Sequence, residues 1–417
     1  MVRISTNTFY TNSINGMNQQ QNTLLNTQLQ LSSGLQINTP ADNPGGAAQV
    51  IDLTQANNMN TQYLANIGNA QNQMSLSTGI LQNVTSLIQS IQSTVISANN
   101  ATLNNSNRQT LATTLQQQFN QLLTLANSQD GQGNYLFSGT MGNTKPFVVT
   151  PTGVQYQGNS GQQRAQVSTS QSLVTNVNGA DLFMRVKNGN GLFATSSNPG
   201  NNGTATISSG STTTPPPTAL QSGNHYTLTF NTTTAGGTTY TLSGTDASGV
   251  ALPPSSLPAP NQPYTSGNTI SFNGIQFSIQ GNPASGDQFQ INPSTNVSTF
   301  QTLQNVIQLL NTPIPSNNSA ANSAYTQQLQ VAEGNLSQSL NAVLNGSVAL
   351  GTNLSAMTNL TSTENNLGVQ YQSAISQVQD VNYTSAISQL SQEKLSLEAA
   401  MQAFTSISSL SLFNYLR

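Results

Sequence analysis

Residues 74–95 read MSLSTGILQNVTSLIQSIQSTV, and an apolar side chain recurs in this stretch at every seventh position. The repeat extends beyond the stretch and falls on Leu53, Ile67, Met74, Leu81, Ile88 and Val95, with Val84 and Ile91 each three residues after one of these. Such spacing forms one stripe along an α-helix, and the stripe is buried against a partner helix. The sequence therefore predicts a long helix from about residue 50 to residue 98.

A second heptad repeat lies toward the other end of the chain and predicts the partner helix. It falls on Leu329, Leu336, Val343, Leu350, Met357, Tyr371 and Val378, and only Glu364 interrupts it. We interpret segments 50–125 and 300–375 as helices of one intramolecular bundle. The repeats lack the flanking Glu and Lys residues that usually select coiled-coil partners, so shape and amide hydrogen bonds must determine the pairing.

Composition excludes several classes of function. Only 5% of the 417 residues are charged and the Lys and Arg residues form no basic patch, so we expect no nucleic acid partner. No run of about eighteen apolar residues is present, so we expect no membrane insertion. There is no cysteine, only one histidine (His225) and no close pair of acidic residues, so we expect no metal site, no cofactor and no enzymatic activity.

The helical pattern stops between about residues 141 and 296, where Gly, Pro and Thr dominate. Residues His225–Phe230 alternate between polar and apolar side chains, as a strand does. Residues 270–272 and 275–279 flank an Asn-Gly pair at 273–274, which is the strongest short signal for a β-hairpin. We therefore predict a β domain inserted midway along the chain.

Together these patterns predict an α+β fold. Both chain ends would build a long antiparallel helical bundle or coiled-coil stalk, and a mostly-β domain would be inserted in the middle. The expected domains are terminal helical assembly arms (1–45 with 376–417), a helical rod domain with a β-hairpin region (46–188 with 297–375), and an inserted variable β domain (189–296).

The outermost arms carry apolar residues with no further chain left to cover them. Short helices are marginally stable in water without tertiary partners, so neighbouring copies are the expected cover. The candidate subunit-packing residues are Leu24, Leu31, Leu35, Ile37, Leu390, Leu397, Met401, Phe404, Leu410, Leu412 and Phe413.

A helix end and restart are predicted between the first two helices. Ser33 and Gly34 indicate a C-terminal stop, since glycine favours the left-handed conformation found there. Asn38, Pro40 and Asp42 indicate a turn, with Asp42 as the expected N-cap of the next helix.

The stretch LSSGLQINTPADNP at 31–44 resembles the turn between the first two helices of the bacterial flagellin family, although Gln36 stands where flagellins usually have Arg. Its second half is more similar to the hook–filament junction branch of that family. So are NRQTLA at 107–112, GNYLFSG at 133–139 and LSLFNYL at 410–416.

This resemblance implies a structural subunit of the bacterial flagellum, located outside the cell, which acts as a hook–filament junction adaptor and joins the hook to the flagellin filament by packing of its terminal helices. The implied partners are other copies of the chain in a ring, a hook-associated protein on the hook side, flagellin on the filament side, and an export chaperone at the C-terminal helix. The chain starts without a sustained apolar stretch, so we expect export without a cleavable signal peptide. Two alternatives stay open, namely a filament-forming flagellin and a surface adhesion module carried by the β insertion.

Overall fold

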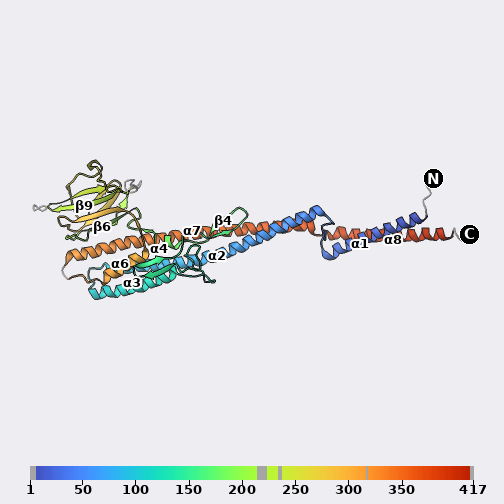
Figure 1. The fold of residues 1–417 in the computed structure, drawn as a ribbon, viewed down its shortest axis with the longest axis horizontal. Coiled ribbons are helices and arrows are strands. Elements are labelled where there is room, and N and C mark those ends of the chain that lie inside the picture. Colours follow the sequence, from blue (N-terminus) through green and yellow to red (C-terminus); the bar gives the residue numbers. More distant parts are fainter. Residues whose placement is uncertain (1–5, 214–222, 233–236, 316–317, 414–417) are drawn as a thin grey trace. The chain divides into compact units, whose positions relative to one another are not determined.

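The computed structural model describes residues 6–213, 223–232, 237–315 and 318–413, and it describes only the backbone of residues 6, 7 and 409–413. Helices form both chain ends and strands occupy the middle of the sequence (Figure 1). The helices are α1 (Thr6–Ser33), α2 (Pro44–Ala98), α3 (Asn105–Ala126), α4 (Gly179–Phe183), α6 (Thr299–Asn311), α7 (Ser319–Gln379) and α8 (Tyr383–Phe413).

The chain divides into two compact units, each of which is described by itself. Unit 1 comprises Met1–Asn66, Val167–Thr169 and Asn359–Arg417. Unit 2 comprises Ile67–Gln166 and Ser170–Thr358. Helices α2 and α7 therefore each contribute one part to unit 1 and one part to unit 2.

Hydroxyl groups are accommodated in the helices by local hydrogen bonds. In α1 the hydroxyl of Thr27 donates to the carbonyl of Thr23 at 3.2 Å, and in α2 Thr85 bonds the carbonyl of Leu81 at 2.9 Å. A hydroxyl that bonds the carbonyl four residues earlier needs neither water nor a charged partner. This local pairing satisfies the hydroxyl groups inside the long helices without a further partner.

The predicted heptad stripes are buried in unit 2. Every apolar heptad position from Ile67 to Val95 on α2, and from Leu329 to Met357 on α7, is 0–1% exposed. The helix predicted over 50–98 is thus confirmed as part of α2, and the helix around the second repeat is confirmed as α7.

Unit 2 also contains the helices α3 and α6 and the short helix α4. Helix α3 begins after the N-cap Asn104, whose side chain accepts from the N–H of Asn107, and α6 begins after the N-cap Ser298. The ring of Phe119 on α3 meets Phe300 on α6 edge to face, with ring centroids 5.9 Å apart. Phe300 also contacts Phe183, so these helices share one aromatic core.

Unit 2 also contains the strands and one 3-10 helix. They are β1 (Phe147–Thr150), β2 (Gly153–Tyr156), β3 (Arg164–Gln166), β4 (Ser172–Val174), β5 (Val186–Lys187), β6 (Phe193–Ser197), β7 (Thr206–Ile207), β8 (Ser211–Thr212), β9 (His225–Thr232), β10 (Thr238–Thr245), η1 (Pro254–Ser256), β11 (Gln262–Pro263), β12 (Thr269–Phe272), β13 (Ile275–Gln280), β14 (Gln288–Pro293) and β15 (Asn296–Val297).

Two antiparallel sheets enclose a hydrophobic core in the strand-rich part of unit 2. One sheet has the strand order β11-β10-β9-β14-β6, and the other has the order β12-β13-β7, with β8 also paired to β13. Their inner faces bury Tyr226, Phe230 and Phe289, among others. The predicted Asn-Gly hairpin is confirmed, since β12 and β13 pair around Asn273 and Gly274, both with positive φ.

These elements confirm the predicted α+β class, with helical chain ends and a strand-rich middle. The predicted division into arms, rod and insertion stays a prediction. In the part of the chain that the structure describes, no helix is long and apolar enough to span a membrane.

Candidate assembly surface

Helix α1 is ended by a glycine. Gly34 has φ +77°, which is the left-handed region where glycine has no steric penalty, and its N–H donates to the carbonyl of Gln30 at 2.9 Å. The Ser33 hydroxyl accepts from the N–H of Leu35 at 3.2 Å. Helix α1 therefore ends where the sequence predicts it to end.

The restart of the chain into α2 differs from the prediction. Asn43, not Asp42, caps the helix, because its side-chain oxygen accepts from the N–H of Gly46 at 3.0 Å and α2 begins at Pro44. Asp42 instead closes the turn before it. Its carboxylate accepts from the N–H groups of Asn38 at 3.0 Å and Thr39 at 2.7 Å.

The charge of Asp42 is stabilised by these bonds. The backbone N–H of Thr39 is the main cause that lowers the pKa of the Asp42 carboxyl below its usual value. Pro40 lies exposed in the same turn, whereas Ile37 is buried beside it. The predicted turn residues thus act in local structure, with a negative charge held at the surface.

The turn after α1 is joined to the turn between α7 and α8. The N–H of Gln36 donates to the carbonyl of Gln379 at 2.6 Å, and the N–H of Val381 donates to the carbonyl of Gly34 at 2.9 Å. A Cβ added to Gly34 would lie 3.1 Å from the hydroxyl of Tyr383. Sequence patterns did not indicate this joint, because its two halves come from opposite ends of the chain.

Helices α1 and α8 lie side by side in unit 1 (Figure 1). The rings of Tyr10 and Phe404 meet edge to face with centroids 5.6 Å apart. Of the predicted packing residues, Ile37 is buried and Met401 is 46% exposed. The half-buried ones are Leu24, Leu31, Leu35, Leu390, Leu397 and Phe404. The side chains of Leu410, Leu412 and Phe413 lie outside the described residues.

The two arm helices also carry large apolar side chains that neither helix covers. We call them the open arm surface, and they are Phe9, Ile14, Leu25, Leu29, Tyr383, Ile387, Leu395, Met401 and Ile407. Exposed apolar side chains gathered on two neighbouring helices are typical of an interaction site. Most of them lie outside the predicted packing residues, because α1 and α8 are apolar on more than one face and show no single stripe.

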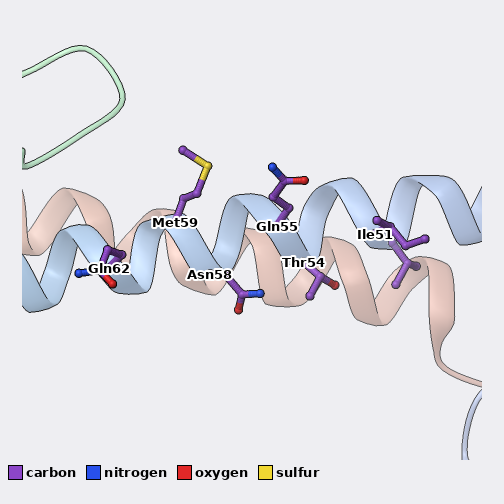
Figure 2. A pocket seen from close by; sticks show the side chains of 7 residues that line it. Ile51, Thr54, Gln55, Asn58, Met59 and Gln62 are labelled. Atoms are coloured by element: carbon purple, nitrogen blue, oxygen red, sulfur yellow. The ribbon is translucent and has the colours of Figure 1, made fainter.

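The start of α2 has a further exposed apolar strip in unit 1. Met59 and Gln55 point to one side of the helix, and Asn58 and Thr54 point to the other (Figure 2). Ile51 is 63% exposed and Met59 is 42% exposed. These residues line a shallow groove without a positively charged side chain.

Side chains that could bind a metal ion or take part in catalysis are scattered over the described residues. Among the described residues no three His, Cys, Asp or Glu side chains are placed to hold a metal ion, and the one ion pair joins Arg185 to Asp181 on the surface. His225 Nδ1 lies 2.9 Å from Oδ1 of Asn292 on a neighbouring strand. Burial is the main cause that raises the pKa of Tyr156 to about 12, and its hydroxyl donates to two backbone carbonyls.

Comparison with known proteins identifies similar chains. A family model for the bacterial flagellin N-terminal helical region matches residues 4–142. The flagellar hook-associated protein 3 of Salmonella typhimurium is 35% identical over 182 residues, which are 44% of this chain and 57% of that protein. The chain thus matches a little over half the length of this curated relative.

Solved structures match over a larger share. A flagellar hook-associated protein-3 from Legionella pneumophila is 30% identical with a TM-score of 0.70, and the match covers 78% of this chain and 98% of the other. The flagellar junction protein FlgL from Legionella pneumophila is 32% identical with a TM-score of 0.64, and the match covers 75% of this chain and 99% of the other.

Proposed function

Because the chain belongs to the family of flagellar hook-associated protein 3, we propose that it is a structural subunit of the junction between the flagellar hook and the flagellar filament. Members of this family are components of the flagellum. The open arm surface is the observation that carries the proposal, since the arm helices leave it uncovered within one copy.

Copies of the chain are the first proposed partners. In a ring of subunits, the arms of one copy would cover the open arm surface of the next and remove it from water, which favours association. We assign the packing role to the residues predicted from the sequence, and the exposed Met401 is the one among them that needs a neighbour most. The arms over 1–45 and 376–417 would form this layer of the assembly.

Two flagellar proteins complete the proposed contacts. A hook-associated protein would lie on the hook side of the ring, and flagellin would lie on the filament side. The nearly uncharged exposed strip at Ile51 and Met59 suits contacts between helices that depend on shape and apolar area. The β insertion at 189–296 would face outward.

An export chaperone is proposed for the state before assembly. Helix α8 exposes Ile387, Leu395 and Met401, and exposed apolar side chains on a helix suit a hydrophobic groove on a partner. Occupation of that groove would keep the open arm surface from aggregating until neighbouring copies replace the chaperone.

Deletion of the gene tests the proposal. Cells without the chain should keep their hooks, lose their filaments and release flagellin into the medium, and a plasmid copy should restore the filaments. Deleted cells with unchanged filaments would overturn the junction role.

A filament-forming flagellin is the less supported alternative, because two solved structures that are at least 30% identical to this chain are a hook-associated protein-3 and a flagellar junction protein. Purified subunit distinguishes the two roles. Long filaments grown from this chain alone would favour the flagellin, whereas short oligomers that accept flagellin at one end are expected of a junction subunit.

A further inference from the structure

One face of α7 carries polar side chains that bond the backbone of the two-sheet region, which we define as the described residues between β5 and β15 (188–295). Gln327 is 3% exposed and Asn335 is 9% exposed. Neither belongs to the heptad line of Leu329 and Leu336. The burial of these two amides therefore has a separate cause, which is their contact with the two-sheet region.

Gln327 bonds both main-chain groups of one strand residue. Its Oε1 accepts from the N–H of Ile207 at 2.7 Å, and its Nε2 donates to the carbonyl of Ile207 at 3.1 Å. Ile207 lies on β7, an edge strand whose other side pairs with β13. An edge strand leaves the N–H and C=O groups of alternate residues without a ladder partner. The Gln327 amide therefore occupies this edge as a neighbouring strand would.

Two further contacts lie one turn before Gln327 and two turns after it. The Ser323 hydroxyl donates to the carbonyl of Thr204 at 3.1 Å as well as within α7, and Oδ1 of Asn335 accepts from the N–H of Gly189 at 3.0 Å. All of the groups that α7 bonds in this way are backbone groups. The helix therefore recognises the path of the main chain in the two-sheet region and not its side chains.

The two-sheet region is joined covalently to the rest of unit 2 through one narrow ribbon. Strands β5 and β15 are each two residues long and pair with each other. Next to them the N–H of Asn188 donates to the carbonyl of Thr295 at 3.0 Å. Two paired strands alone form a weak structure, since they lack the packing of a larger sheet. The ribbon by itself therefore leaves the two-sheet region free to swing.

Apolar packing between the two-sheet region and the helices is incomplete. A cleft of about 240 Å³ lies between β6, α6 and α7, and its lining includes Ser196, Leu309 and Val331. Val331 stands four residues from Gln327 and four from Asn335 on α7. Because apolar side chains do not fill the space between these two amides, the attachment depends more on the hydrogen bonds on either side of it.

We propose that Gln327 is a latch that holds the two-sheet region against α7, and that the β5–β15 ribbon is the hinge about which this region swings when the latch is removed. Asn335 bonds Gly189, two residues after the end of β5. Gln327 lies eight residues from Asn335, which is about 12 Å along a helix. A contact far from a hinge restrains rotation more than a contact close to it. The proposal concerns the isolated chain and does not rest on the junction role.

Spin labels on engineered cysteines can test it, because the chain contains no cysteine of its own. One label is attached through Ser248→Cys, in an exposed turn of the two-sheet region, and the other through Gln117→Cys, exposed on α3. Double electron–electron resonance then measures the distribution of distances between the labels in the purified chain. The native chain should give one narrow distribution, and a broad one would overturn the proposal.

Gln327→Ala should at least about double the width of this distribution, because the N–H and carbonyl of Ile207 lose their partners and gain water only if the region moves away. Gln328→Ala is the matched control, since it removes the same side chain from the next residue, which is exposed. The control should leave the width unchanged. No broadening with Gln327→Ala, or equal broadening with the control, would overturn the latch.

Asn335→Ala tests the position of the hinge. It should broaden the distribution less than Gln327→Ala does, because Asn335 bonds the chain beside the ribbon. A larger effect of Asn335→Ala would contradict a hinge at β5 and β15.

Hydrogen exchange in β9 and β14 checks that the two-sheet region stays folded in each variant. If Gln327→Ala lowers protection there, Gln327→Glu replaces it, since glutamate has the same size and keeps an oxygen that accepts from Ile207. At neutral pH its carboxylate has no proton to donate to the Ile207 carbonyl, so the distribution should broaden, and it should narrow again in acid when the carboxyl is protonated. Gln328→Glu should show no such change. A width that is independent of pH in Gln327→Glu, or a pH dependence shared by the control, would overturn the proposal.

Discussion

The α2–α7 helix pair behaves differently in the two units, although one heptad pattern runs through both. In unit 2 the heptad positions from Ile67 to Val95 are buried. There α3 bonds α2 through Gln118 and Ser90, and α6 bonds α7 through Thr299 and Ser339. In unit 1 the heptad residues Leu53, Tyr371 and Val378 are only half-buried.

The difference shows that periodicity and burial are separate properties of a sequence. A heptad repeat determines which face of a helix pairs, whereas further elements determine how deeply that face is buried. Unit 2 brings α3 and α6 against the pair, and unit 1 leaves the corresponding faces open within one copy. The same pattern thus forms a closed core in one unit and leaves its residues partly exposed in the other.

The largest expected effect is a loss of unfolding free energy, and it is seen by comparing the substitution of one leucine in each unit. Leu81→Ala should lower the free energy of unfolding of unit 2 by about 3 kcal/mol, because it leaves a cavity in a closed core. Leu53→Ala should lower that of unit 1 by about 1 kcal/mol, because its side chain is already half in water. Hydrogen exchange read by mass spectrometry reports each unit separately, and equal losses of protection would contradict the comparison.

Gly34→Ala should lower the free energy of unfolding of unit 1 by about 1 kcal/mol. The substitution forces a residue with a side chain into a left-handed backbone conformation near Tyr383. Gly16→Ala is the matched control, because Gly16 lies inside α1 with nothing within 4 Å of an added Cβ. That change should stabilise α1 by about 0.5 kcal/mol. Amide hydrogen exchange rates in α1 and α8 measure the stability change in both variants. The prediction fails if the two substitutions change these rates in the same direction.

Tyr156→Phe should lower the free energy of unfolding of unit 2 by about 1 kcal/mol, because the hydrogen bonds to the carbonyls of Phe137 and Asn159 are lost. Because folding raises the pKa of Tyr156 from 10.0 to about 12, its contribution is complete below pH 10.0 and is lost as the pH rises to about 12. Alkaline unfolding of the variant should lack this part of the transition. An identical alkaline profile in both proteins would contradict the assignment.

Asp42→Asn should give the smallest effect, confined to the turn in unit 1. Hydrogen bonds from Thr39 and Asn38 lower the pKa of Asp42, so its contribution is complete above its ordinary value of 3.8 and is lost as the pH falls through the lower value in the folded chain. Exchange of the Asn38 and Thr39 amide protons should therefore accelerate in acid. In the variant the acceleration should be absent, and its persistence would assign the effect to another group.

Local signals in the sequence predicted much of the fold. The heptads identified α2 and α7, and the Asn-Gly pair identified the hairpin of β12 and β13. The N-cap was misassigned to Asp42 because two capping residues stand in a row. Pro44 distinguishes them, since proline favours the first position of a helix and so indicates Asn43 as the cap.

Features that depend on distant segments could not be predicted in the same way. In the five-stranded sheet β6 pairs with β14, and where the turn after α1 meets the turn between α7 and α8, Gly34 bonds Val381. Neither contact has a local sequence signal, because each depends on where the intervening chain returns. The open arm surface was missed for a related reason, since its exposure depends on how little of α1 and α8 the other helix covers.

The hydrogen bonds between the turn after α1 and the turn between α7 and α8 join residues from opposite ends of the chain. Closing so long a loop has a large entropic penalty, and contacts of this kind form slowly unless intervening segments fold first. Hairpins such as β12 with β13 close over a few residues and precede them. We therefore expect contacts between the two ends of the chain to form after such hairpins, which lengthens the time over which a folding subunit presents its arm helices to solvent.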